Sequence, residues 1–326
     1  MSVRRRYREL ITAPGILVLP GVYDGLSARI AERAGFSALV AGGNAAIGSM
    51  LAGADIGQSN MRDYADHYAR ICGAVEIPVT VDADTGFGDV HNVQRTVRAF
   101  EAAGVAGLMI SDQVFPNRCG YLAGKEVVPA EQMVAKIKAA VDARTDPDMV
   151  IIARTDAAGV TGLDDAIWRA RLYLEAGADL GRPQGVDTPE AIARVIAEVP
   201  CPFIAILSQA AGKRRLDIAD LEALGVAGVT LPTISLFAAA RNVARVLGAL
   251  RRTNSLDGLD DELMPLDAYY DLVGLDRDRA REESFHDAAR TLVAAAEAAQ
   301  GAGQDLPRAG DRRGSRETAP ATPAAP

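Results

Sequence analysis

The chain is poor in cysteine and histidine and has no long apolar run. Its three cysteines are too few for a disulfide framework, so the reducing cytoplasm is the expected location. Its three histidines do not have the spacing of a metal-ligand pair. No apolar run approaches the roughly 18 residues of a membrane span. The basic N-terminal residues are followed by a segment that contains Pro14, Gly15, Pro20 and Gly21. This segment is predicted to form a strand, so it does not make a signal peptide.

The chain also lacks an excess of positive charge. It has 35 Lys and Arg against 43 Asp and Glu, and a formal net charge of −8. This balance argues against nucleic acid or an anionic membrane as the main partner. A small anionic substrate stays compatible, because local charge decides its binding. With 326 residues, of which 49% are hydrophobic, the chain can form one large α/β barrel with a tail, or two smaller domains.

Short apolar runs typical of buried strands recur along the chain, with Ala-rich amphipathic segments between them. Eight strands are predicted, at residues 16–20, 38–42, 77–84, 107–112, 149–155, 178–181, 202–207 and 227–232. Helices are predicted at residues 23–34, 61–75, 92–103, 130–143, 164–176, 188–198, 218–224 and 235–250. Such alternation indicates a parallel sheet covered on both faces, and predicts a TIM-type (β/α)8 barrel over residues 1–250. An open doubly wound sheet is the alternative, but no Gly-x-Gly-x-x-Gly follows the first strand.

The pattern changes after the predicted barrel. A polar stretch at 251–262 leads into two predicted helices at 263–274 and 276–300. These helices need a surface to pack on, so we expect residues 251–300 to form an oligomer contact. Residues 301–326 contain almost no large apolar side chain. That segment cannot bury enough surface to offset its ordering entropy, and we predict it to be disordered.

The strand-like run at residues 79–88 ends in two carboxylates and two glycines. Asp82 and Asp84 are two residues apart, so on a strand they point to the same side. Two such carboxylates repel each other unless a proton or cation lies between them, and Mg2+ suits carboxylate oxygens. Helix capping or turn hydrogen bonding is the alternative role. Because the active site of a (β/α)8 barrel lies at the carboxyl ends of its strands, we favour the metal site.

Two other predicted strands end in groups that could bind an anion. Gly42 and Gly43 leave backbone N–H groups open, which suits a carboxylate or an oxyanion, although a plain tight turn fits as well. Arg154 ends the fifth strand, where a guanidinium needs an anionic partner. That partner is either a substrate carboxylate or an internal ion pair with Asp82 or Asp156.

A long loop at residues 112–125 follows the fourth predicted strand, and long ordered loops often act as lids. Within this loop, Cys119 lies between Arg118 and Gly120. An adjacent cation favours the thiolate form that acid/base or nucleophilic work needs. A surface loop with an incidental cysteine is the alternative.

These segments in this order resemble the isocitrate lyase/phosphoenolpyruvate mutase superfamily, nearest its methylisocitrate lyase-like branch. The resemblance covers roughly residues 10–290. It is carried by the segments at 20–24, 42–43, 82–88, 112–120, 124–125 and 153–157, above all Asp-Ala-Asp-Thr-Gly and Arg-Cys-Gly.

The resemblance implies a Mg2+ site, with Mn2+ possible, and a homotetramer or homodimer with exchanged C-terminal helices. It implies that Asp84 ligates the metal and that Asp55 and Asp82 hold metal-bound water. Cys119 would be the general acid/base, and the substrate would be a small carboxylate or oxo acid. The further candidates are Arg118, Tyr121 and Arg154 for catalysis, and Tyr23, Ala41, Gly42, Gly43, Asp82, Gly120, Arg154 and Gln184 for substrate binding.

The chain departs from the family pattern at several of these positions. The lyases carry Glu at the positions of Ser111 and Gln184, and they carry Lys at Asn117 and His at Tyr121. They carry Asn at Leu207, Glu at Ala210 and Ser at Ala41.

Three interpretations follow. We prefer a Mg2+-dependent enzyme that makes or breaks a C–C bond next to a carboxylate or carbonyl through an enolate-type intermediate, on an altered and less anionic substrate. The second is a standard lyase of methylisocitrate-like 2-hydroxy-dicarboxylates, or an oxo-acid decarboxylase. The third is an inactive barrel kept for binding or assembly. Retention of Asp82, Asp84, Cys119 and Arg154 favours the first.

Overall fold

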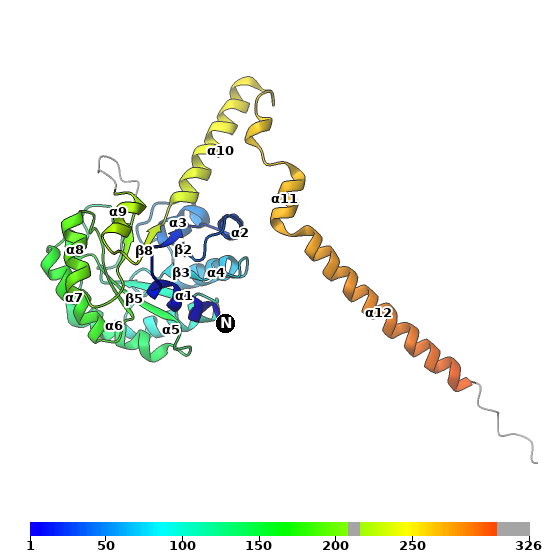
Figure 1. Cartoon of the computed structure of the whole chain (residues 1–326), viewed down its shortest axis with the longest axis horizontal. Coiled ribbons are helices and arrows are strands. Elements are labelled where there is room, and N and C mark those ends of the chain that lie inside the picture. Colours follow the sequence, from blue (N-terminus) through cyan, green and yellow to red (C-terminus); the bar gives the residue numbers. More distant parts are fainter. Residues whose placement is uncertain (208–215, 305–326) are drawn as a thin grey trace, which may run out of the picture. The chain divides into compact units, whose positions relative to one another are not determined.

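The computed structural model describes residues 1–207 and 216–304, and within them helices alternate with eight strands (Figure 1). The strands are β1 (Leu17–Pro20), β2 (Leu39–Ala41), β3 (Val79–Asp82), β4 (Gly107–Ser111), β5 (Val150–Thr155), β6 (Leu180–Pro183), β7 (Ile204–Ile206) and β8 (Gly228–Leu231). The helices up to residue 253 are α1 (Val3–Thr12), α2 (Gly25–Arg33), α3 (Gly43–Leu51), α4 (Met61–Cys72), α5 (Val90–Ala102), α6 (Ala130–Ala143), α7 (Leu163–Glu175), α8 (Pro189–Glu198), α9 (Ile218–Ala223) and α10 (Ile234–Thr253).

The strands follow one another in the circular order of a barrel. All pairs are parallel, in the orders β2-β3-β4-β5-β6 and β1-β8-β7, so the last strand lies beside the first. A bridge between Gly21 and Val40 joins the β1 and β2 edges. Between β6 and β7 the described residues form no ladder, but the Arg182 side chain donates to the Ile204 carbonyl at 3.2 Å. This order confirms the predicted (β/α)8 fold.

The strands form where the sequence has apolar runs because both sheet faces are covered. Side chains of β4 and β5 are almost entirely buried, as a parallel sheet under helices requires. Several helices close through a glycine in the left-handed region, for example Gly35 at φ 92° and Gly177 at φ 108°. That conformation costs glycine little, and it turns the chain back into the next strand.

Two helices of the barrel unit were not predicted. The polar helix α1 begins at Ser2, whose side chain accepts from the Arg5 N–H, and it buries Tyr7 and Ile11 in the cluster inside the barrel. The four-residue spacing of Tyr7 and Ile11 is the sequence signal for this helix. The helix α3 begins directly at Gly43, where we predicted only an open turn.

The chain divides into two compact units, Met1–Pro265 and Leu266–Pro326. The second unit contains α11 (Leu266–Val273) and α12 (Leu275–Gln304). The helix α12 includes residues 301–304, which we had assigned to a disordered tail; the rest of that predicted tail lies outside the described residues. In the part of the chain that the structure describes, no helix is long and apolar enough to cross a membrane.

Candidate active site

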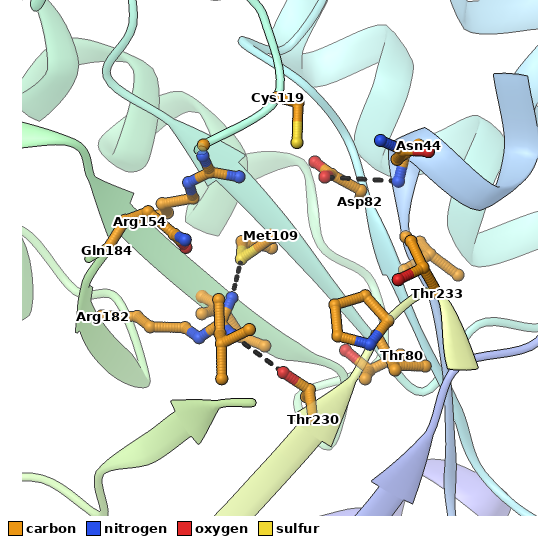
Figure 2. Close-up of a pocket in the computed structure, with 18 of the residues that line it drawn as sticks. Asn44, Thr80, Asp82, Met109, Cys119, Arg154, Arg182, Gln184, Thr230 and Thr233 are labelled. Carbon is orange, nitrogen blue, oxygen red and sulfur yellow. Dashed lines mark hydrogen bonds between the residues drawn. The ribbon is translucent and has the colours of Figure 1, made fainter. Parts of the chain in front are cut away.

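The carboxyl ends of the strands surround a cavity of about 240 Å3 (Figure 2). In this view Asp82 and Asn44 lie on one side, and Arg154, Gln184 and Arg182 lie on the other. The lining also includes Tyr7, Val40, Gly42, Gly43, Asp55, Thr80, Val81, Met109, Cys119, Gly120, Tyr121, Ile152, Ile204, Ile206, Thr230, Pro232, Thr233 and Phe237. An acidic wall therefore faces a cationic one.

The carboxylates of Asp82, the last residue of β3, and of Asp84 converge on the start of α3. A Cβ atom placed on Gly43 would lie 3.3 Å from both Asp82 Oδ2 and Asp84 Oδ1. The Gly43 N–H donates to Asp82 Oδ2 at 3.4 Å, and the Asp84 N–H donates to Asp82 Oδ1 at 3.0 Å. Asp84 itself has φ 47°, an uncommon conformation for a residue with a side chain. A side chain at position 43 would therefore require the two carboxylates to move by a few tenths of an ångström.

Mutual repulsion and burial make this wall unfavourable for three ionised carboxylates. Burial, followed by the charges of Asp82 and Asp55, raises the pKa of Asp84 well above its ordinary value. Burial and the charge of Asp82 raise the pKa of Asp55 to about 6, although Arg154 partly offsets them. A divalent cation would remove this repulsion.

The donor set fits a hard cation that keeps part of its water shell. The Tyr64 and Asn117 side chains neighbour Asp84, where hydrogen bonding to them partly offsets the rise in its pKa, and the buried Asn117 Oδ1 atom has no hydrogen-bond partner. Within residues 1–207 and 216–304, no three His, Cys, Asp or Glu side chains group closely enough to hold a metal ion by themselves. Mg2+ commonly takes one or two carboxylates and several waters, so these residues fit Mg2+ bound largely through water.

The cationic wall is built on Asp156, which is fully buried. Its carboxylate accepts from Arg154 Nε at 2.8 Å and Arg154 Nη2 at 3.0 Å, from Lys125 Nζ at 2.8 Å and from the Ser111 hydroxyl at 3.2 Å. Burial alone would raise the pKa of Asp156, but Arg154 and Lys125 outweigh it and lower the pKa to about 2. Of the two internal ion pairs left open by the sequence, Arg154 forms the one with Asp156, and it still lines the cavity.

The loop after β4 is fastened over the cavity at both ends. The Gln113 side chain exchanges two hydrogen bonds with the backbone of Arg118, and the Cys119 N–H donates to the Asp55 carbonyl at 3.0 Å. Lys125 Nζ donates to the Gly120 carbonyl at 2.6 Å. A Cβ atom on Gly120 would lie 2.6 Å from Arg154 Nη2. This close approach brings the half-buried Cys119 to the cavity.

Most of the predicted site residues line the cavity, and four do not. Arg118 is exposed and donates to the Ala123 carbonyl, so it does not line the cavity with Cys119, whereas Arg154 does. Ala41 is buried in the hydrophobic core, and Tyr23 lies beyond β1 with its N–H bonded to Ser27. Asp84 is 5% exposed and lies behind the lining, next to Asp82.

Sequence reasoning missed Arg182, Tyr7, Thr80 and Thr230, which all line the cavity. A signal existed for Arg182. It is two residues after Leu180, which packs in the cluster inside the barrel, so strand alternation places both side chains on the inner face.

Fold and site together define a (β/α)8 protein with facing acidic and cationic walls at the carboxyl ends of its strands. The phosphoenolpyruvate phosphomutase family matches residues 7–251. A 2,3-dimethylmalate lyase of Eubacterium barkeri is 36% identical over 285 residues, which cover 87% of this chain and 99% of that protein. A 2-methylisocitrate lyase of Aeropyrum pernix is 38% identical over 287 residues, covering 88% and 92%.

Solved structures give the same assignment. An oxaloacetate acetylhydrolase in complex with 3,3-difluorooxalacetate has a TM-score of 0.82 and 30% identity, covering 87% of this chain and 97% of that one. A phosphonopyruvate hydrolase complex with oxalate and Mg2+ has a TM-score of 0.76 and 30% identity, covering 87% and 99%. The chain belongs to the phosphoenolpyruvate mutase/isocitrate lyase superfamily.

Proposed function

We propose that the protein is a Mg2+-dependent enzyme of the carbon–carbon lyase type, with a small carboxylate or oxo acid as its substrate. It makes or breaks a C–C bond next to a carboxylate or carbonyl through an enolate-type intermediate. The observation that carries this proposal is the acidic wall of Asp55 and Asp82, with Asp84 directly behind it, in the cavity that Arg154 and Cys119 also line. Its relatives named as lyases, and the relative solved with oxalate and Mg2+, support the reaction type and the ion.

In this proposal the acidic wall holds the cation. Asp84 would be the direct ligand, and Asp82 and Asp55 would accept hydrogen bonds from metal-bound water. Mn2+ could replace Mg2+, because it accepts the same oxygen ligands. A cation held here would supply electrostatic stabilisation of negative charge on substrate oxygens. The first N–H groups of α3, beyond the one that Asp82 occupies, face the same region and favour an anionic group.

Arg154 binds the substrate carboxylate. Burial would lower its pKa, but the charges of Asp156 and Asp82 keep that pKa above the ordinary value, so the guanidinium is always protonated. Its bidentate contact with Asp156 fixes the plane of the fork before substrate arrives. Such preorganised charge lowers the barrier because no reorientation is needed during the reaction.

Cys119 supplies the proton that the carbanion requires after bond cleavage, and it takes that proton back in the condensation direction. The loop that carries it excludes water from the cavity, with Gly120 packed against Arg154 and Tyr121 at the lining. An altered substrate is supported by Gln184, which is 2% exposed and has no partner for its Oε1 atom. An amide at this position accepts a ligand donor without adding negative charge.

The metal site is tested by thermal denaturation with and without Mg2+. The wild type is expected to gain several degrees with Mg2+, and Asp84→Asn to gain almost nothing. Asp66→Asn, at an exposed carboxylate on α4, is the matched control and should behave as the wild type. If the wild type shows no response to Mg2+ or Mn2+, the metal assignment is wrong.

The reaction is tested by incubating the protein with 2-methylisocitrate, 2,3-dimethylmalate, oxaloacetate, other malate-type acids and aldol-type substrates, and following the oxo-acid products. With any substrate that is turned over, Cys119→Ser should lower the rate at least about a hundredfold. Cys72→Ser, at a cysteine outside the cavity, is the control. A near-normal rate for Cys119→Ser would reject the proton-donor role. Ligand binding without turnover of any of these acids would favour the inactive barrel.

A further inference from the structure

The cationic wall holds a second guanidinium that Asp156 does not neutralise. Arg182 is 7% exposed and lines the cavity from β6 (Figure 2). Its partners are the Ile204 carbonyl at 3.2 Å, the Thr230 hydroxyl at 3.0 Å and the Met109 sulfur at 2.8 Å. Among the described residues no carboxylate lies within ion-pair distance of it. A buried arginine without an acidic partner is rare, because desolvating a charge is costly.

The three partners of Arg182 do not complete its hydrogen bonding. A guanidinium has five N–H groups, and three of them are used here. One of those three goes to a thioether, which is a weak acceptor. Burial and the nearby charge of Arg154 lower the pKa of Arg182 to about 10, so the group stays charged at neutral pH. A charged fork with two unused N–H groups therefore lines the cavity.

Other polar groups lie in the same cavity. The Tyr7 hydroxyl is buried beside the Thr80 side chain, and Arg182 is close enough for its charge to oppose the rise that burial causes in the pKa of Tyr7. Thr80 and Thr230 add hydroxyl groups to the lining. Met109, whose sulfur accepts from Arg182, is paired in register with Asp82 of the acidic wall. The Arg182 guanidinium on β6 thus lines the same cavity as the acidic wall.

We propose that Arg182, with Thr230 and Tyr7, forms a second anion subsite, which binds a carboxylate at the far end of a substrate whose oxo-acid end lies between Arg154 and the acidic wall. The proposal rests on the proposed function for the placement of the oxo-acid end only. A purely structural role, in which Arg182 bridges the gap between β6 and β7, is the competing explanation.

Paired probes separate these roles without requiring turnover. The dissociation constants of 2-oxoglutarate and 2-oxopentanoate are measured by calorimetry in the presence of Mg2+. The two acids differ in that a terminal carboxylate replaces a methyl group. The wild type should bind 2-oxoglutarate at least about tenfold more tightly. Arg182→Gln should bring the ratio of the two constants close to one and leave the 2-oxopentanoate constant nearly unchanged. Arg194→Gln, at an arginine half exposed on α8, should keep the wild-type ratio.

The outcomes are distinct. A structural role for Arg182 lowers the melting temperature of Arg182→Gln but leaves the ratio of dissociation constants at the wild-type value, and that result overturns the proposal. If Arg182→Gln does not fold, Arg182→Lys decides, because a point charge without the fork should give an intermediate ratio; an unchanged ratio again overturns the subsite.

Failure of the proposed function is recognised separately. Glutarate and pentanoate carry no oxo group, so the preference of the protein for glutarate over pentanoate is measured without Mg2+. A preference for glutarate that Arg182→Gln abolishes supports the subsite even where Mg2+ has no effect. The subsite is wrong if the wild type binds neither 2-oxoglutarate more tightly than 2-oxopentanoate nor glutarate more tightly than pentanoate.

Discussion

Replacing Asp156 with asparagine should be among the most damaging single changes in the barrel. The Asp156 carboxylate is completely buried and compensates two buried cations, since the Arg154 and Lys125 side chains are 10% and 8% exposed. Asparagine has nearly the same shape but no charge, so it leaves both cations without an anion. Removing one partner from a buried ion pair typically costs about 3–5 kcal/mol. We expect Asp156→Asn to lose that much free energy of unfolding at pH 7.

The pKa of Asp156 gives an independent estimate of the same interaction. The structure lowers it from 3.8 to about 2. A shift of this size corresponds to about 2–3 kcal/mol of preference for the ionised form in the folded state. Because the folded pKa lies below the unfolded one, this stabilisation is fully present above pH 4 and is lost as the pH falls from about 4 to 2.

Urea denaturation at pH 7 and between pH 5 and 2 measures both effects. The acid-induced loss of stability in the wild type should exceed that in Asp156→Asn by the amount assigned to Asp156. Asp66→Asn is the matched control: Asp66 also pairs with one arginine, but its side chain is 47% exposed and that of Arg62 is 78% exposed. An exposed pair contributes roughly 0–1 kcal/mol. If Asp156→Asn costs no more than Asp66→Asn, the ion-pair argument for the cationic wall is wrong.

Three further changes test other parts of the structure. Gly120→Ala brings a Cβ atom within 2.6 Å of Arg154 Nη2. Either the loop or the Arg154 guanidinium, which Asp156 holds, must then shift, so turnover should fall about a hundredfold. Gly159→Ala, where the Cβ atom has room, should not change turnover. Without metal, stability should decrease as the pH rises above about 4, because the raised pKa values of Asp84 and Asp55 mean that the folded state binds more protons than the unfolded state. The thermal gain from Mg2+ should accordingly increase between pH 5 and 8, as protons stop competing for these carboxylates, and a constant gain would contradict the site. If α12 forms the predicted oligomer contact, replacing both of its exposed residues Phe285 and Leu292 by glutamate should reduce the oligomer size measured by light scattering. Glu297→Ala is the control. An unchanged oligomer size in the double variant would reject the contact.

Most of the strands were predictable because they are β-branched or apolar runs bounded by glycine, proline or a polar residue; β6, which contains Gly181 and Arg182, is the exception. Because helices connect the strands, the strands run in one parallel direction. All their carboxyl ends then lie at the same end of the barrel, which is where Asp82, Arg154 and Cys119 were predicted. The helix α3 was not predictable in the same way. Its start, Gly43-Asn44-Ala45, resembles a turn, but Gly43 is the first residue of the helix and its N–H donates to Asp82 Oδ2.

The assignment of side chains within the site was less accurate than that of the strands. Arg118 precedes Cys119 in the sequence, but neighbours in an extended loop point in different directions, and Arg118 bonds to Ala123 on the exposed side. Arg154 and Cys119, 35 positions apart, line the cavity together because the strand and the loop converge there. Adjacency in the sequence is thus a poor guide to the charge next to a loop residue.

The cationic wall also changes what the substitution at position 184 means. In the sequence, Gln184 is one of several departures from the family pattern, which together suggested an altered and less anionic substrate. In the structure Gln184 follows Arg182 by two residues at the end of β6, and both line the cavity. A carboxylate at position 184 would add negative charge to a wall in which Asp156 already compensates Arg154 and Lys125. The amide adds none, and Arg182 keeps its charge available to a ligand. Gln184 and Arg182 therefore act in the same direction: together they make the cavity more receptive to a second carboxylate, not less.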